Sequence, residues 1–375
     1  MKSRLPNGLT EFSLAESRQH EEIVGKLFEI LKKEGFNKIE PSQIDYAKNL
    51  EMEPGSADFL FKSIDSDGKL LAFGGGITPS IVRMLDGETH IRRVYFDRPC
   101  YLFSPLQEGS RLTWECGAQV YGIKEPEGDA ELITACYDSL VFSGIENIKI
   151  TLSHSFLFKS IIYSYKPSQE ITSKDIKDLI KTGKCDKLND VCTNAIITLS
   201  KQKGDITVLQ QVAEGINNKE AMDCLVRLFE IYQILAEYGL EDIIEFDFGY
   251  MPLESYYNGM SFKISADDKT LAEGGTFSGV KYTSVIAAVG FKYNLYNVMS
   301  ILDTKQNQND SNIILGVANT IRALNKARKI KLSLMESNVQ VNTLYKVTAE
   351  ECKEIAAQLN IENIIYVNEK GDLEE

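Results

Sequence analysis

The chain has 375 residues, of which 43% are hydrophobic and 25% are charged, and its net charge is -13 at pH 7. This length and composition are typical of a globular protein of roughly two or three units with a sizeable core. The acidic balance opposes binding to nucleic acid, because affinity for phosphate groups comes mostly from lysine and arginine. The most basic stretch, NKARKIK at 325–331, is expected to be an ordinary solvated segment.

Cysteines, histidines and apolar runs exclude further classes of protein. The seven cysteines form no CxxC pair and mostly stand among apolar residues, which indicates reduced thiols in a cytoplasmic protein. The three histidines lie far apart without metal-ligand spacing, so we expect no metal site and no other cofactor. The N-terminal MKSRLPNGLTEFS lacks the apolar centre of a signal peptide, and no run approaches the roughly 18 apolar residues of a membrane span.

The first part of the chain predicts helices alternating with strand pairs. Apolar residues recur at helical spacing near the N-terminus, and Thr78-Pro79 is typical of a helix start. In chain order, we predict a helix at 15–35, a short strand at 36–44, a hairpin at 57–73, a helix at 78–87, a hairpin at 92–104 and 111–123, a helix at 124–143 and a strand at 147–154.

The second part predicts a helical block, further strands and a small tail. Because the strands come as hairpins rather than βαβ repeats, we expect an α+β fold with an antiparallel sheet flanked by helices. The predicted elements are a wholly helical insertion at about 155–240, strands at 243–250, 256–267, 269–277 and 284–291, a helix at 294–303, a linker at 304–312, a helix at 319–329, a strand at 330–336, a helix at 348–360 and a strand at 362–369. This pattern predicts a main domain at 1–303 and a small α/β unit at 311–375.

The strand at 111–123 carries a row of polar residues on one face. Side chains alternate along a strand, so Arg111, Thr113, Glu115, Gly117 and Gln119 face one side. The opposite face is apolar. Two interpretations of the polar row stay open, a binding site and an exposed sheet face, and Gly117 favours a site because it lets a ligand lie against the strand.

Three other segments offer polar or glycine-rich surfaces. They are LESYYNGMSFKI at 253–264, LAEGGTFSGV at 271–280 and AFGGGITPS at 72–80. The glycines before the Thr-Pro helix start could cradle an anion, yet they match neither phosphate-binding loop pattern. Alone, each segment is a weak signal.

In order, however, these segments resemble the histidyl-tRNA synthetase-like branch of the class II aminoacyl-tRNA synthetases. Within that branch they look most like regulatory subunits of ATP phosphoribosyltransferase, the first enzyme of histidine biosynthesis. LPNGLTEFS, NKIEPSQIDY, ITPSIVRML, the hairpin RPCYLFSP…RLTWECGAQVYG and AAVGFKYNLYNVMS resemble successive family motifs. The resemblance covers about residues 5–303 and implies a class II synthetase-like fold that dimerises through the first helix and the strand ending at Pro41.

Departures from the family pattern imply that catalysis is lost. A synthetase of this class uses cations to stabilise the ATP phosphates, but the three expected arginines are replaced by Ser104, Pro252 and Asn297. Loss of one such contact typically costs about 10²–10³ in rate, so the loss of three should abolish adenylate formation. Arg111 is kept, although one cation cannot form a clamp.

The amino-acid pocket that the resemblance implies is altered but largely kept. The family's glutamine and glutamate have exchanged places at Glu115 and Gln119, and Gly76 stands where an acidic residue is expected. A carboxylate is still present to pair with a ligand ammonium. The residues that the resemblance assigns to histidine or a related amino acid are Thr78, Arg111, Glu115, Gln119, Tyr256, Tyr257, Gly274 and Gly275.

The resemblance therefore implies a non-catalytic regulatory subunit in a hetero-oligomer. It would be required by a short-form catalytic subunit and would mediate feedback by histidine, without nucleic-acid or membrane partners. The alternative is a pseudo-synthetase that senses another small ligand or serves another partner. This alternative stays open because Glu115 and Gln119 have exchanged places and because Gly76 stands where an acidic residue is expected. An active histidine–tRNA ligase is disfavoured. The tail faintly resembles a reduced anticodon-binding unit, and packing or oligomer contact is the alternative for it.

Overall fold

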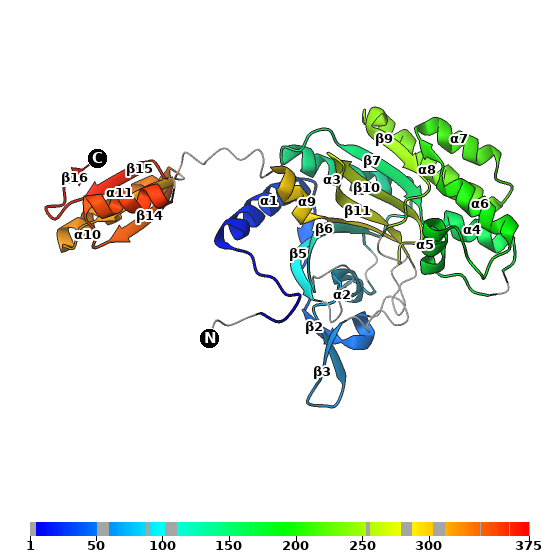
Figure 1. Cartoon of the computed structure of the whole chain (residues 1–375), viewed down its shortest axis with the longest axis horizontal. Helices are drawn as coiled ribbons and strands as arrows, with labels where there is room; N and C mark the ends of the chain where they lie inside the picture. Colours follow the sequence, from blue (N-terminus) through cyan, green and yellow to red (C-terminus); the bar gives the residue numbers. More distant parts are fainter. Residues whose placement is uncertain are drawn as a thin grey trace. The chain divides into compact units, whose positions relative to one another are not determined.

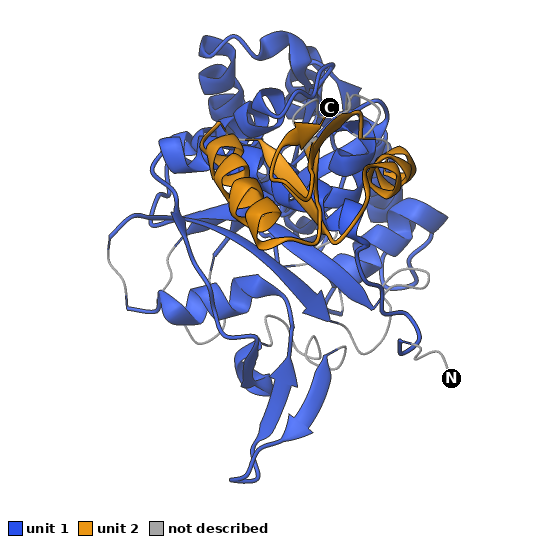
Figure 2. Ribbon diagram, turned by 90° about the vertical axis from the view of Figure 1, so that its left-hand side faces the viewer, with its two compact units in different colours: residues 1–303 blue, residues 304–375 orange. Residues whose placement is uncertain are grey.

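The chain forms two compact units, Met1–Asp303 and Thr304–Glu375. Figure 1 shows the computed structural model, and Figure 2 colours the two units separately. The structure describes residues 5–50, 60–87, 90–101, 111–167, 169–252, 256–278, 287–302, 312–337, 339–359 and 361–374. Ser104 and most of the predicted linker lie outside these ranges.

A nine-stranded sheet organises the first unit, in the order β1-β5-β6-β12-β11-β10-β7-β9-β8. Pairing is antiparallel except between β1 and β5 and between β7 and β9, which agrees with the predicted α+β fold. The strands are β1 (Asn37–Lys38), β5 (Arg92–Tyr101), β6 (Leu112–Tyr121), β7 (Lys149–His154), β8 (Lys203–Gly204), β9 (Ile244–Asp247), β10 (Met260–Ala266), β11 (Lys269–Phe277) and β12 (Ala288–Tyr293). A separate sheet has the order β2-β4-β3, with β2 (Ile44–Tyr46), β3 (Phe61–Ile64) and β4 (Leu70–Phe73).

The two faces of the main sheet have different coverings. One face carries α1 (Leu14–Lys33), α3 (Pro126–Phe142) and α9 (Leu295–Leu302), and it holds the large apolar core to which Cys116, Ala118 and Val120 of β6 contribute. The short helix α2 (Ile77–Met84) covers the opposite face, where it packs with residues such as Phe96 and Tyr121 (Figure 1). The predicted alternation along β6 is thus correct, and Glu115 and Gln119 of its polar row contact α2.

The helical insertion belongs to the main core. It comprises α4 (Leu157–Ser164), α5 (Ser173–Thr182), α6 (Asp190–Ser200), α7 (Ile206–Glu214) and α8 (Lys219–Glu237). Buried residues of these helices, such as Ile196 and Leu228, form one continuous apolar cluster with the sheet. Within the described residues of this block, the expectation of a wholly helical insertion is wrong at β8, a short edge strand that pairs with β9. Among the described helices, none is long and apolar enough to cross a membrane.

The second unit is a small α/β fold. Its sheet has the order β14-β13-β15-β16, with β13 (Asn312–Val317), β14 (Gln340–Tyr345), β15 (Asn363–Val367) and β16 (Leu373–Glu374), and its helices are α10 (Ile321–Glu336) and α11 (Ala349–Gln358). The predicted strand at 330–336 is wrong, because α10 continues through it. The alternation in IKLSLME suggested a strand, but Ile330 packs on the core cluster of this unit while Leu332 is exposed.

A buried ion pair joins α3 to α8 and predicts a large effect on stability. Arg227 Nε donates to Asp129 Oδ2 at 2.9 Å, and the Thr276 hydroxyl donates to Asp129 Oδ1 at 3.0 Å. Replacing Arg227 by Met leaves a buried carboxylate without its cation, so the free energy of unfolding should fall by about 3 kcal/mol in urea titrations. The control Lys33→Met removes an exposed helical pair with Glu29 and should change it by less than about 0.5 kcal/mol. Equal effects of the two variants would contradict this role of the buried pair.

Candidate functional site

The site is built where β6 passes beneath the start of α2. The N-cap residue of α2 is Gly76, which has no side chain to bond the free N–H groups of the first turn. Glu115 of β6 supplies the missing acceptor, because its Oε2 accepts the N–H of Ile77 at 2.6 Å. A carboxylate at a helix N-terminus is also favoured by the helix dipole. The side chain of Glu115 therefore connects the start of α2 to the sheet by a hydrogen bond.

A lysine from the neighbouring strand completes this contact. Lys292 of β12 donates from Nζ to Glu115 Oε1 at 2.7 Å, and their side chains are 20% and 10% exposed. Burial alone would raise the pKa of Glu115, but the Lys292 charge and the Ile77 N–H outweigh it and hold this pKa below the usual value. Glu115 is therefore ionised at neutral pH, with both carboxylate oxygens engaged by the chain itself.

The second half of the site is a chain of hydrogen bonds around Gln119. Gln119 Nε2 donates to Thr78 Oγ1 at 2.8 Å, and the hydroxyl of Tyr121 donates to Gln119 Oε1. Thr78 Oγ1 lies 3.3 Å from the hydroxyl of Tyr256, with either group able to donate. This network joins β6, α2 and the segment before β10. Buried amides and hydroxyls are tolerated because they satisfy one another.

Aromatic rings pack beside this network. The rings of Tyr256 and Tyr257 lie 4.8 Å apart between centroids, and Phe277 packs edge-on against both. Gly275 lies beneath the ring of Tyr257, which a Cβ at this position would approach to 3.0 Å. Gly274 belongs to the opposite face, where a Cβ would meet the core ring of Phe262. Only one of the two predicted glycines therefore lies against the tyrosine rings.

Gly117 has a different role from the one that its sequence context suggested. A Cβ there would overlap the carbonyl oxygen of Phe291 on β12, so the close approach of this neighbouring strand requires glycine.

The structure brings together Thr78, Glu115, Gln119, Tyr256, Tyr257 and Gly275, but it places Arg111 elsewhere. The guanidinium of Arg111 donates to the carbonyl of Asn7 at 3.3 Å and lies 4.4 Å from the ring centroid of Phe61. Its side chain thus contacts the N-terminal segment and β3. Thr113 is exposed. Of the polar row of β6, Glu115 and Gln119 are the members that contact α2, toward the C-terminal end of the strand.

Two of the positions where arginines were expected can be located. The carbonyl of Pro252 accepts from Lys177 Nζ at 2.6 Å. Asn297 lies in α9, where its side-chain amide donates to the carbonyl of Thr270 at 2.7 Å. Neither side chain provides a cation, although Lys177 brings an ammonium from the insertion to the first of these positions.

Three residues of the site were not predicted. Lys292 contacts Glu115, and Tyr121 contacts Gln119. The third residue is Arg98, which donates from Nη2 to the carbonyl of Gly75 at 2.8 Å and so holds the glycine segment before α2. The polar residue Lys292 within AAVGFKY was the available signal. Its partner could not be known without the strand order. In the described part of the chain, no three acidic, cysteine or histidine side chains gather as a metal site would require.

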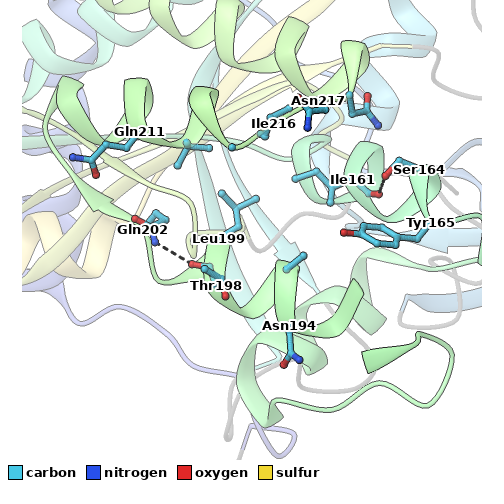
Figure 3. Close-up of a pocket in the computed structure, with 14 residues that line it drawn as sticks. Ile161, Ser164, Tyr165, Asn194, Thr198, Leu199, Gln202, Gln211, Ile216 and Asn217 are labelled. Atoms are coloured by element: carbon cyan, nitrogen blue, oxygen red, sulfur yellow. Dashed lines mark hydrogen bonds between the residues drawn. The ribbon is translucent and has the colours of Figure 1, made fainter. Parts of the chain in front are cut away.

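A separate cavity of about 850 Å³ lies within the insertion (Figure 3). It is lined by uncharged residues, including Asn194, Gln211 and Tyr165, and by none of the predicted site residues. In the wall of this cavity, the side-chain amide of Gln202 donates a hydrogen bond to the carbonyl of Thr198. The cavity is therefore independent of the site beneath α2.

The class of the protein follows from these features and from comparison with known proteins. The family model described as Histidyl-tRNA synthetase matches residues 8–298. The chain belongs to the histidyl-tRNA synthetase family, and the resemblance of its motifs to this branch is confirmed.

Similar chains identify the branch more closely. A protein of Clostridium novyi named ATP phosphoribosyltransferase regulatory subunit is 24% identical and covers 99% of this chain and 93% of its own length. One of the same name from Clostridium kluyveri is 26% identical, with 82% and 84% covered.

Solved structures show the same fold. A crystal structure from Bacillus halodurans, described as an ATP phosphoribosyltransferase regulatory subunit/histidyl-tRNA synthetase, has a TM-score of 0.80 at 16% identity and covers 98% of each chain. A histidine–tRNA ligase subunit from Alicyclobacillus acidocaldarius has a TM-score of 0.68 at 16% identity and covers 81% of this chain and 98% of its own. These likenesses confirm the class II synthetase-like fold.

The close approach of β6 and β12 can be tested by adding one methyl group. Gly117→Ala forces a Cβ onto the carbonyl of Phe291. The free energy of unfolding should therefore fall by about 1–3 kcal/mol, and the variant should unfold at a clearly lower urea concentration. Gly25→Ala is the matched control, because Gly25 lies inside α1 with nothing within 4 Å of a Cβ. The Gly25→Ala change should raise the free energy of unfolding by about 0.5–1 kcal/mol. A neutral Gly117→Ala would contradict the packing described for these strands.

The ion pair at the start of α2 predicts a pH-dependent loss of stability. Glu115→Gln keeps the shape but leaves Lys292 without its charge partner, so unfolding at pH 7 should become about 3 kcal/mol easier. The pKa of Glu115 is lowered in the folded state from its ordinary 4.5, so its contribution is present above about pH 4.5 and is lost as pH falls through the folded-state pKa. The difference between wild type and variant should therefore shrink in acid. A constant difference from pH 7 to pH 3 would contradict this account.

Proposed function

We propose that this chain is a non-catalytic regulatory subunit of ATP phosphoribosyltransferase, required by a short-form catalytic subunit and responsive to histidine. One observation carries the proposal, namely that a relative of that name aligns with 99% of the chain, including the C-terminal unit. The first step of histidine biosynthesis would then be controlled through a protein whose fold is that of a synthetase.

The absence of catalysis is supported by the chemistry of the site. Adenylate formation needs cations placed where phosphate charge develops. Pro252 and Asn297 occupy two of the positions where the family places arginine, and the third, Ser104, belongs to a segment outside the described residues. The ammonium of Lys292, on the strand next to β6, is paired with Glu115.

The network around Gln119 offers a way to sense a neutral ring. An imidazole beside the ring of Tyr256 could replace the bond between Gln119 and Thr78, since its nitrogens supply one donor and one acceptor. Thr78 belongs to α2, so a ligand at this point would change how that helix is held. Such a ligand controls activity only if it binds one state of the complex better, typically by about 1–3 kcal/mol.

A second candidate is a pseudo-synthetase that senses another small ligand. The contacts of Glu115 favour it, because both carboxylate oxygens are engaged and Gly76 removes the other expected acid. In either case we propose a dimer through α1 and the segment from β1 to Pro41, by analogy with the family.

Reconstitution tests the proposed function directly. Mixing the chain with a short-form catalytic subunit from the same genome should raise phosphoribosyl transfer to ATP well above that of either protein alone, and histidine should then inhibit it. No stimulation at any ratio of the two proteins would overturn the proposal. Stimulation without inhibition by histidine would favour the second candidate.

Calorimetric titration with histidine tests the pocket. Gln119→Met removes the amide that bridges Tyr121 and Thr78, so we expect at least about tenfold weaker binding. Gln211→Met, an exposed residue of the insertion cavity, should leave the affinity unchanged. If both variants bind histidine as the wild type does, histidine does not use this pocket.

A further inference from the structure

The two tyrosines of the pocket belong to the tyrosine segment, residues 256–259, which is anchored on β11. The N–H groups of Asn258 and Gly259 both donate to the carbonyl of Thr276, at 3.0 and 3.3 Å. Gly259 also lies directly against the side chain of Thr276, because a Cβ at position 259 would come within 2.8 Å of Thr276 Cβ. The position of Thr276 therefore sets the position of the tyrosine segment.

The side chain of Thr276 is held in turn from the face of the sheet that carries α3. Its hydroxyl donates to Asp129 Oδ1 at 3.0 Å, and Arg227 Nε donates to Asp129 Oδ2 at 2.9 Å. Asp129 belongs to α3, whereas Arg227 belongs to α8 of the insertion. Because Asp129 is only 2% exposed, its carboxylate depends on these two donors rather than on water.

The surroundings of Arg227 show that this ion pair has no competing buried charge. Arg227 Nη2 donates to the carbonyl of Lys124 at 2.8 Å, and the charge of Arg227 helps to lower the pKa of Glu125 at the exposed surface. From β7, His154 faces the same guanidinium. Burial and the charge of Arg227 lower the pKa of His154 to about 3, so its imidazole is neutral at pH 7. Within the described ranges, Asp129 is the one acid that forms a salt bridge with Arg227.

Two further contacts hold the tyrosine segment, and neither involves the helices of the insertion. The N–H of Ser155 donates to the carbonyl of Gly259 at 2.8 Å. The side chain of Asn258 donates to the carbonyl of Ser278 at 2.9 Å and accepts its N–H at 3.1 Å. These bonds keep the segment attached to the sheet when the contact with Asp129 is lost. Loss of Arg227 should therefore shift the tyrosine segment rather than release it.

We propose that Arg227 is a positioning residue of the effector pocket, through which helix α8 of the insertion sets the affinity for the ligand. It acts through Asp129 and Thr276 on Tyr256, whose hydroxyl meets Thr78 of α2. This inference rests on the proposed function only in that the pocket beside Tyr256 takes the effector. By linkage, a ligand whose affinity depends on how α8 is seated must itself favour one seating of that helix.

Hydrogen exchange tests the positioning role without any ligand. In the full chain, Arg227→Met should speed exchange of the Asn258 and Gly259 amides at least about threefold relative to the amides of β6, because their acceptor on Thr276 is less well fixed. Ile196→Ala is the matched control, since it removes buried apolar volume from α6 in the same insertion and also lowers stability. This control should not raise exchange of the tyrosine segment relative to β6.

Calorimetric titration with histidine measures the consequence for the pocket. The dissociation constant should rise at least about fivefold in Arg227→Met and stay within about twofold of the wild type in Ile196→Ala. Thr276→Val removes the hydroxyl that bonds Asp129 but keeps the shape and the carbonyl, so it should weaken binding by a similar factor. Because both changes break one line of contacts, the double variant should bind no more weakly than the weaker single variant. Arg227→Lys keeps the charge and should bind histidine better than Arg227→Met.

The possible outcomes separate this inference from the proposed function. If Arg227→Met and Thr276→Val change neither the exchange of the tyrosine segment nor the affinity for histidine, Arg227 has no positioning role, while the proposed function stands. Fully additive effects would also overturn the inference. If Arg227→Met fails to fold, as judged by circular dichroism, Arg227→Lys and Thr276→Val decide the same question. If the wild type binds no histidine at millimolar concentration, the proposed effector fails, and hydrogen exchange still decides whether Arg227 positions the segment.

Discussion

The start of helix α2 has no cap of its own, and this constraint organises the site. Gly76 offers no side chain to the free N–H groups, so the acceptor comes from Glu115 on the sheet below. A buried carboxylate needs a positive partner, and Lys292 on the adjacent strand supplies it. Helix, strand and lysine therefore form one electrostatic unit. The polar row on β6 has a structural role before any ligand is considered.

The site beneath α2 joins parts of the chain that are far apart in sequence. Thr78, Gln119 and Tyr256 meet in one network, although Thr78 and Tyr256 are 178 residues apart. The opposite face of the same strands is the apolar core under α3, which fixes their spacing. A ligand that changes the network would act on α2 rather than on the core. Helix α2 is held by these polar contacts and also by the apolar packing of Ile77, Ile81 and Val82.

Local signals predicted the fold well where they agreed with tertiary contacts. Alternation identified both faces of β6, and Thr78-Pro79 marked the start of α2 within two residues. In IKLSLME, the alternation of apolar and polar residues led to a wrong prediction of a strand, because a helix with an exposed Leu332 gives the same pattern. Within the site, Glu115 and Gln119 were selected from the sequence, but the partner of Glu115 was not visible there. Lys292 lies 177 residues from Glu115, and only the adjacency of β6 and β12 joins them.

The central claim is that this synthetase-like site senses and no longer activates. Exchange of labelled pyrophosphate into ATP, with magnesium and histidine present, measures activation directly and needs no partner protein. The account predicts no label in ATP above the protein-free background, beside an active histidyl-tRNA synthetase as positive control. Histidine-dependent exchange by this chain would contradict the account.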